Sequence, residues 1–172
     1  MFEVTVAEGY ELVSVKVDGV VVTAESGKYT GRIAGNTLIS VETKVAGAKD
    51  PVLAATLDFT AQSYTNAQVV SSLTVSEYTV TFAKAKGNND PAYYNTGKAV
   101  RAYGGNTFTV TGKAIAKIVI TFSSGEKDNA ITSDVGTFAT DTWTGSADSV
   151  TFTIGGTSGH RRIAKIEVYT LG

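Results

Sequence analysis

Two runs of alternating apolar and polar residues stand near the end of the sequence, at 150–154 and 163–169. Alternation with a period of two is typical of strands that bury one face. Small residues form the loop between the runs, and its end carries the only histidine, His160, followed by Arg161 and Arg162. The pattern predicts a closing β-hairpin whose loop brings the histidine and the arginines to one place on the surface.

Short alternating runs of the same kind recur along the whole chain, with turn residues between them. Asp18-Gly19 separates two such runs and is the strongest signal for a two-residue hairpin turn. Only residues 64–71 could form a helix, two turns long, with Thr65 or Asn66 as its N-cap. The absence of any longer helical pattern argues against a doubly wound sheet. The sequence therefore predicts an all-β fold, a sandwich of jelly-roll type with one short helix. The other predicted strands span 2–6, 12–17, 20–23, 29–33, 38–41, 57–60, 73–75, 79–84, 99–103, 107–111, 115–122 and 131–138.

The chain divides into two predicted units. Residues 1–46 form a small β unit that is too short to bury much core by itself. Residues 55–172 form the larger antiparallel sandwich. The segment between them contains Asp50-Pro51 and small residues, which predicts a linker, with a strand across part of it as the alternative. Because Met1 leads directly into a strand-like run, we expect a piece of a longer secreted protein, with a small intracellular protein as the alternative.

Composition excludes several classes of function. The net charge is −1, so no general attraction to nucleic acid or to anionic membranes is expected. No apolar run approaches the roughly 20 residues of a membrane-spanning helix. The sequence contains no cysteine, which removes disulfides, thiol catalysis and cysteine-based metal sites.

The larger unit resembles a poorly characterised β-sandwich accessory module of secreted and surface proteins from gut Bacteroidetes and Firmicutes. The likeness covers residues 57–169. It is carried by FTAQSYTNAQVV, VTFAKAKGNNDPAYYNTGKAVRAYGGNTFTV, KIVITFSSGEKDNAITSDVGTF and WTGSADSVTFTIGGTSGHRRIAKIEV. The first unit resembles the immunoglobulin-like or repeat-type spacers of the same proteins through GYELVSVKVDG and GKYTGRIAGNTLISV, with its opening strand trimmed as one alternative. Related spacer modules also occur on virions of bacteriophages that infect such bacteria.

We predict that the chain is not an enzyme. A serine–histidine–aspartate site would need His160 as its base, yet Ser158 lies in the same short loop and no Gly-x-Ser-x-Gly motif is present. A glycosidase would need paired carboxylates. The aspartates are scattered in turn-like settings, where this side chain commonly accepts backbone amides. They are Asp128, Asp134, Asp141 and Asp148.

Aromatic residues in loops are the candidates for carbohydrate binding, because sugars stack on exposed rings. Tyr93 and Tyr94 follow Pro91 in a polar loop, Tyr103 ends a predicted strand, and Trp143 follows a predicted turn. A lone tryptophan in a β domain is also a frequent core residue, which is the alternative for Trp143.

Basic side chains could add hydrogen bonds to the same ligand. The arginine fork suits carboxylates, sulfates or sugar hydroxyls, and the candidates are His160, Arg161 and Arg101. Alternation places Arg161 and Arg162 on opposite faces, so only one of them can share a face with His160. The structural alternative is that an arginine pairs with Glu126 or Asp134. The predicted ligand-binding residues are Tyr93, Tyr94, Arg101, Trp143, His160 and Arg161.

A structural calcium ion is the one cofactor that the loops allow. Asn88-Asn89-Asp90 and Asp128-Asn129 offer the oxygen ligands that calcium prefers, although neither loop matches the twelve-residue calcium-binding pattern. The predicted ligands are Asp90, Asp128 and Asn129. No other cofactor is expected.

The sequence thus predicts a non-catalytic accessory module of a secreted or cell-surface bacterial protein that binds carbohydrate. The alternative is a structural or adhesive module that contacts other proteins through exposed strand edges, including a virion accessory protein such as a head decoration or fibre. The expected partner is a glycan or a protein surface, not nucleic acid. The expected location is extracellular or on the cell surface, with the virion as the alternative.

Overall fold

The computed structural model describes residues 1–31, 35–125 and 128–172, which form two compact units, Met1–Lys49 and Asp50–Gly172. Every strand pairing is antiparallel, and no helix occurs in the described ranges. The all-β class predicted from the alternation is therefore confirmed. Within these same ranges, no helix that could cross a membrane is found.

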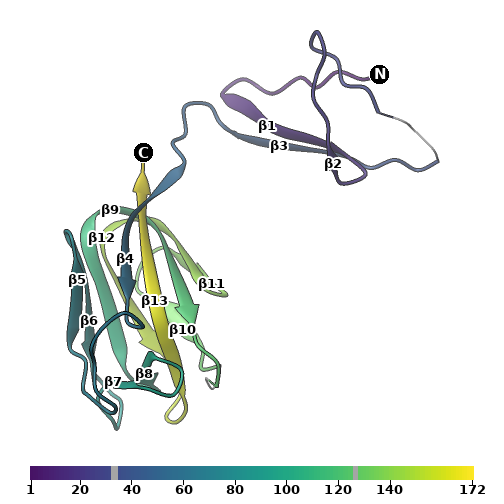
Figure 1. Cartoon of the computed structure of the whole chain (residues 1–172). Helices are drawn as coiled ribbons and strands as arrows, with labels where there is room; N and C mark the ends of the chain where they lie inside the picture. The colour runs from purple at the N-terminus through teal and green to yellow at the C-terminus, as the bar shows by residue number, and fades with distance from the viewer. Residues whose placement is uncertain (32–34, 126–127) are drawn as a thin grey trace. The chain divides into compact units, whose positions relative to one another are not determined.

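The first unit is a three-stranded sheet in the order β2-β1-β3 (Figure 1). Its strands are β1 (Tyr10–Val17), β2 (Val20–Val21) and β3 (Ile39–Val45). Asp18 and Gly19 join β1 to β2 with positive φ angles of 50° and 83°. Both central residues of a type I′ turn have this conformation, so the predicted hairpin is confirmed. The predicted strand at 2–6 is reduced to one isolated bridge between Phe2 and Tyr29, and residues 32–33 of the run at 29–33 lie outside the described ranges.

The second unit consists of one curled, sandwich-like sheet of ten strands. The first strand begins at Pro51, so the segment predicted as a linker contributes most of a strand, as its alternative proposed. The ten strands are β4 (Pro51–Asp58), β5 (Ser72–Val75), β6 (Tyr78–Ala83), β7 (Ala92–Tyr94), β8 (Ala99–Tyr103), β9 (Thr107–Phe122), β10 (Ile131–Ser133), β11 (Thr137–Ala139), β12 (Thr142–Ile154) and β13 (His160–Leu171).

Two long strands, β9 and β12, run through both halves of this sandwich. Residues 107–111 of β9 lie between β6 and residues 149–153 of β12. Residues 115–122 of β9 pair with β13 on one edge, and residues 115–119 pair with residues 142–147 of β12 on the other. The two halves of each long strand thus have different neighbours, which is how strands turn a corner from one layer of a sandwich to the other.

The closing hairpin predicted for 150–154 and 163–169 is wrong. Both runs are strands, but β12 and β13 pair with opposite edges of β9, which lies between them. Both strands run antiparallel to β9 and hence parallel to each other, so the loop at 155–159 leads from beside the start of β9 to beside its end instead of making a hairpin turn. Alternation specifies which face of a strand is buried, but it does not specify the neighbouring strand.

The helix predicted at 64–71 is also wrong. Ala67 has a φ of 63°, which no α-helix permits. Backbone amides of this segment bond to the segment before and within β7, because Ala67 N donates to Tyr93 O (2.8 Å) and Val70 N donates to Pro91 O (3.0 Å). The segment lies extended along β7, and this tertiary pairing outweighs a helix of two turns.

Aromatic and aliphatic side chains from both halves of the sandwich fill a single core. Phe108 and Phe152 stack with centroids 4.7 Å apart, and Phe82 lies 5.9 Å from Phe108. Ile118 and Ile166, from the other half, are also fully buried in this cluster. Burial of this continuous apolar cluster stabilises the curled sheet.

The corner in β9 depends on residues 112–114. Ala114 has a φ of 55°, and its backbone N–H donates to the carboxylate of Asp148 across the sheet (2.7 Å). Gly112 leaves room for the buried ring of Tyr78, whose hydroxyl donates to the Lys113 carbonyl (3.2 Å). A β-carbon at position 112 would overlap that ring.

Gly112→Ala should therefore destabilise the sandwich unit. We expect the free energy of unfolding to fall by about 1–3 kcal/mol, because the buried Tyr78 ring must move. Denaturant unfolding followed by circular dichroism measures this loss. In the double variant with Tyr78→Leu the two losses should be less than additive. Full additivity would show that residue 112 does not pack against Tyr78.

Candidate functional site

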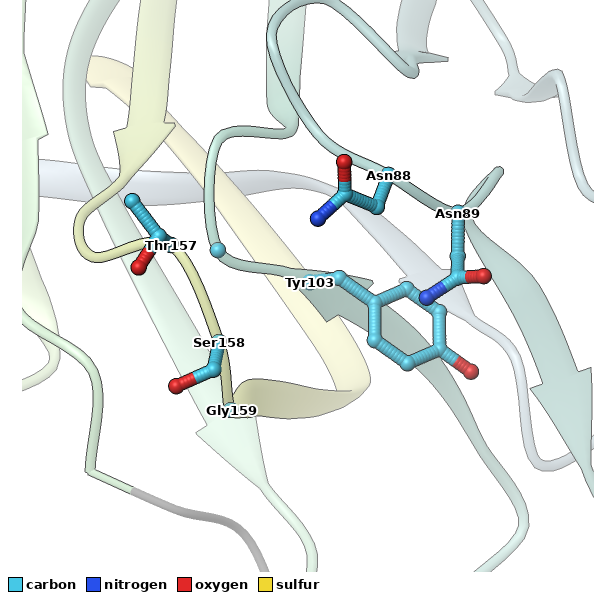
Figure 2. A pocket seen from close by; sticks show the side chains of 7 residues that line it. Asn88, Asn89, Tyr103, Thr157, Ser158 and Gly159 are labelled. Carbon is cyan, nitrogen blue, oxygen red and sulfur yellow. The ribbon is translucent and has the colours of Figure 1, made fainter.

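A pocket of about 240 Å³ opens where three loops of the second unit meet. Asn88 and Asn89 come from the β6–β7 loop, Gly104 from the β8–β9 turn and 157–159 from the β12–β13 loop. Figure 2 shows Thr157 and Ser158 on one side, and the two asparagines with the ring of Tyr103 on the other. The lining offers amides, hydroxyls and one aromatic ring, which are the groups that hold a polyhydroxyl ligand.

Asn106 fixes the first side of this pocket. It is the only polar side chain that is fully buried among the described residues. Its amide nitrogen donates to the carbonyls of Lys84 (2.9 Å) and Asn89 (3.0 Å), and its amide oxygen accepts the N–H of Tyr103 (2.7 Å). One side chain thus ties the β6–β7 loop to the end of β8. Satisfied buried networks of this kind are rigid.

Asn129 fixes the opposite side. Its amide nitrogen donates to the carbonyls of Gly155 (2.6 Å) and Ser158 (2.8 Å). Its own backbone carbonyl accepts a hydrogen bond from Arg161 Nη1 (2.9 Å). The loop that carries Ser158 is therefore anchored to the β9–β10 connection, and the pocket is formed before any ligand arrives.

A row of polar and aromatic side chains continues from the pocket along the outer face of β8 and β13. Tyr103 pairs with His160, and Arg101 pairs with Arg162. Paired residues of antiparallel strands share a face, and Val100 and Ala102 of β8 are buried on the other one. The outer face is only partly buried at all four positions, so a ligand can reach it.

Contacts along this row are close. The Arg101 guanidinium lies 3.9 Å from the centre of the Tyr94 ring, and Tyr103 donates its hydroxyl to that of Tyr94 (3.1 Å). The Tyr103 and His160 rings meet edge to face with centroids 5.9 Å apart. Arg162 Nε donates to His160 Nε2 (3.3 Å). Tyr103 therefore belongs both to the pocket and to the row of basic side chains.

Burial raises the pKa of Tyr103 to about 12 from an ordinary value of 10.0, and the hydroxyl of Tyr94 adds to the effect. The nearby Arg101 guanidinium acts in the opposite direction, because it favours the phenolate. At neutral pH the Tyr103 hydroxyl is thus a stable hydrogen-bond donor.

This pKa predicts a loss of stability in alkali that Tyr103→Phe should reduce. The folded protein keeps the Tyr103 proton to about pH 12, whereas the unfolded chain releases it near pH 10.0. The contribution of Tyr103 to stability is therefore complete below pH 10 and is lost as the pH rises toward 12. Unfolding measured across this range should show a steeper decline for the wild type than for the phenylalanine variant. Parallel declines would contradict the raised pKa.

Two of the predicted stacking platforms are contradicted by the structure. Trp143 is fully buried, and its indole N–H donates to the carbonyl of Val135 (2.7 Å). Tyr93 is 4% exposed and packs on Tyr64 with centroids 5.4 Å apart. Both rings belong to the core, so neither can stack on a sugar. Tyr94 is partly exposed, but Arg101 covers one face of its ring.

The predicted basic residues of β13 lie on opposite faces of the strand, as alternation requires. His160 shares its face with Arg162, whereas Arg161 turns to the other face and lies 3.9 Å above the Phe122 ring. The structure thus places Arg101, His160 and Tyr94 together and adds Arg162, which the sequence analysis named without choosing it. Strict alternation from His160 was the signal that could have selected Arg162. Of the two predicted acidic partners, Asp134 instead accepts the N–H of Thr151 (2.8 Å), and Glu126 lies outside the described residues.

The sequence analysis also missed the amides and hydroxyls of the pocket itself. Asn88 and Asn89 were considered only as calcium ligands, and Ser158 only as a nucleophile. Within the part of the chain that the structure describes, no group of three or more His, Asp or Glu side chains is placed to hold a metal ion. Of the predicted calcium ligands, Asp90 does not line the pocket, and Asn129 serves as the hydrogen-bond anchor described above.

Comparison with known proteins adds no further assignment. No protein-family model matches the chain, and no curated protein or solved structure was found to be similar to it.

Proposed function

We propose that this protein is a non-catalytic carbohydrate-binding module of a secreted or cell-surface bacterial protein, and that the loop pocket of the second unit holds the sugar. The observation that carries the proposal is the preformed polar lining around Tyr103 (Figure 2). Amide and hydroxyl groups offer both donors and acceptors, which a sugar ring with several hydroxyls requires. The resemblance of residues 57–169 to an accessory module is in keeping with this role.

The size and rigidity of the pocket support the same conclusion. A volume of about 240 Å³ lies somewhat below the roughly 300–1,000 Å³ of drug-sized ligand sites, so one sugar ring at the end of a chain is the fitting occupant. Asn106 and Asn129 hold the two sides in place. A preformed site does not have to order its loops on binding, which favours affinity.

Glycan-array screening followed by calorimetry tests the proposal. We expect millimolar to micromolar binding to at least one saccharide class, with about tenfold weaker binding for Asn88→Ala or Tyr103→Ala, because each removes a direct contact. Asn95→Ala is the matched control, since Asn95 is an exposed loop asparagine that does not line the pocket. The absence of any binder at millimolar concentration would refute the proposal, and so would binding that both pocket variants leave unchanged.

A structural or adhesive module is the second candidate. Several large apolar side chains of the first unit are exposed, among them Val20, Val21 and Leu38, and exposed strands of this kind can serve protein contacts. The carbohydrate proposal is preferred because the second unit offers a formed pocket.

A further inference from the structure

We propose that the saccharide bound by this module carries a negatively charged group, a carboxylate or a sulfate, and that Arg101 and Arg162 bind it. This inference rests on the proposed function and specifies its ligand class. The two arginines occupy directly paired positions on β8 and β13. Like charges at such positions repel each other and destabilise a sheet. A bound anion between them removes that repulsion.

The described part of the chain supplies little compensation for the two charges. Among the residues that the structure describes, no carboxylate oxygen lies within 4 Å of either guanidinium. The Nε of Arg101 is shielded from solvent and has no hydrogen-bond partner there, and the hydroxyl of Ser123 is in the same state. That hydroxyl lies beside Arg162, since both would contact a β-carbon at Gly97, at 2.8 Å and 3.5 Å. Among the described residues of this region, hydrogen-bond donors thus outnumber acceptors. Such a surplus suits an anion, because an anion only accepts hydrogen bonds.

Both guanidinium groups are held in fixed orientations. The guanidinium carbon of Arg101 lies over the Tyr94 ring, 3.9 Å from its centre. Arg162 donates through Nε to His160 and through Nη1 to the carbonyl of Ser124 (2.6 Å), and no partner of its Nη2 is found among the residues that the structure describes. Arginine that is oriented in advance loses little side-chain entropy on binding a planar oxyanion through its fork.

Tyr103 links the charged pair to the pocket. Its ring lines the pocket, its hydroxyl contacts Tyr94, and Arg101 precedes it by two residues on the same face of β8. A sugar ring in the pocket can therefore extend an acidic substituent, or an adjoining acidic residue of the saccharide, along β8 toward both arginines. Asp90, the nearest acidic residue in sequence to the lining asparagines, is not part of the lining.

Calorimetry on the full chain with two matched pairs of probes tests the inference. The first pair is trigalacturonic acid and its methyl ester, which differ in charge but keep the same rings. The second is N-acetylgalactosamine 6-sulfate and N-acetylgalactosamine, of which only the first is charged. We expect the charged member of at least one pair to bind about tenfold or more tightly than its neutral partner, and the pair that shows the difference identifies carboxylate or sulfate. Added salt should weaken the binding of that charged probe and leave its neutral partner unaffected.

Arg162→Gln and Arg101→Gln should each weaken binding of the charged probe by about tenfold and change binding of the neutral probe little. Lys113→Gln removes the same charge from an exposed position elsewhere in the unit and should have no effect. Arg162→Lys, which retains the charge without the fork, should be intermediate. Circular dichroism establishes that each variant is folded, and the comparison of matched probes on the wild type does not depend on any variant.

The outcomes separate this inference from the proposed function. Equal binding of the charged and neutral probes would overturn the charge recognition and leave saccharide binding intact. Loss of affinity for both probes alike in the arginine variants would also overturn it. The absence of binding by every saccharide would refute both proposals.

Discussion

Replacing Trp143 with alanine is expected to lower the free energy of unfolding of the second unit by about 3–5 kcal/mol. The side chain is fully buried in the core, so its removal leaves a large cavity. It also leaves the Val135 carbonyl without the indole donor that now lies at 2.7 Å, which adds to the loss. Denaturant unfolding followed by far-ultraviolet circular dichroism measures the effect, since the variant lacks the tryptophan that fluorescence would need.

Tyr10→Ala provides the matched control. Tyr10 is 52% exposed, and truncation of a surface ring should change stability by no more than about 0.5 kcal/mol. In the wild type, the emission of Trp143 should be shifted to the blue and should resist quenching by iodide, because the ring is shielded from water. Efficient quenching, together with an unchanged unfolding midpoint for the alanine variant, would mean that the ring faces solvent.

Asn106→Ala is expected to cost about 2–4 kcal/mol, a large effect for a polar residue. The substitution leaves the buried carbonyls of Lys84 and Asn89 without donors and the N–H of Tyr103 without an acceptor. Each unsatisfied buried group costs about 1–3 kcal/mol, less whatever the structure recovers by relaxing. Saccharide affinity should fall as well, because the β6–β7 loop that carries Asn88 and Asn89 loses its anchor.

Asn106→Asp distinguishes the hydrogen bonds from the shape of the side chain. Aspartate can still accept the N–H of Tyr103, but it places a carboxylate oxygen against two carbonyls, so we expect it to be destabilising despite its nearly identical size. Asn95→Ala, at an exposed turn position, should leave stability within about 0.5 kcal/mol. Thermal and denaturant unfolding of the three variants measures these differences. Equal losses in the free energy of unfolding for Asn106→Ala and Asn95→Ala would contradict the role given to the Asn106 hydrogen bonds.

The positions of many strands could be predicted from the sequence, because burial of one face leaves alternation in the chain. Exceptions are β7, which lies in a segment predicted as a polar loop, and the first half of β12. The runs at 73–75, 79–84 and 99–103 each coincide with a strand to within about two residues. The runs at 107–111 and 115–122 belong to a single strand. The break between them, which resembles a turn in sequence, is a corner at Ala114.

The pairing of the strands could not be predicted in the same way. The β12–β13 loop has the composition of a hairpin loop, yet β9 lies between the two strands. That arrangement is decided by the long-range packing of β9, which no local pattern records. The helix predicted at 64–71 failed for a similar reason, since hydrogen bonds to residues 91–93 replace its internal ones.

Part of the candidate site was accessible from the sequence. Tyr94, Arg101 and His160 were selected by residue type, and the structure gathers them on one face. Trp143 and Tyr93 were selected by the same argument, but both are buried. The type of an aromatic residue does not specify the face of the sheet on which its side chain lies. Asn106 follows two glycines, a sequence that is typical of a turn, and only the structure shows that its amide ties the β6–β7 loop to the end of β8.

Nuclear magnetic resonance mapping of the backbone amides offers the most direct measurement of the central claim. Trigalacturonic acid, titrated into the full nitrogen-15-labelled chain at millimolar concentration, should shift the amides of Asn88, Asn89, Tyr103, Gly104 and 157–159, with further shifts at Arg101 and Arg162. These residues meet at one end of the second unit, where β7 and β8 lie opposite the C-terminus (Figure 1). Shifts confined to residues 1–49, or spread over β4 and β5 with none at the pocket, would contradict the account.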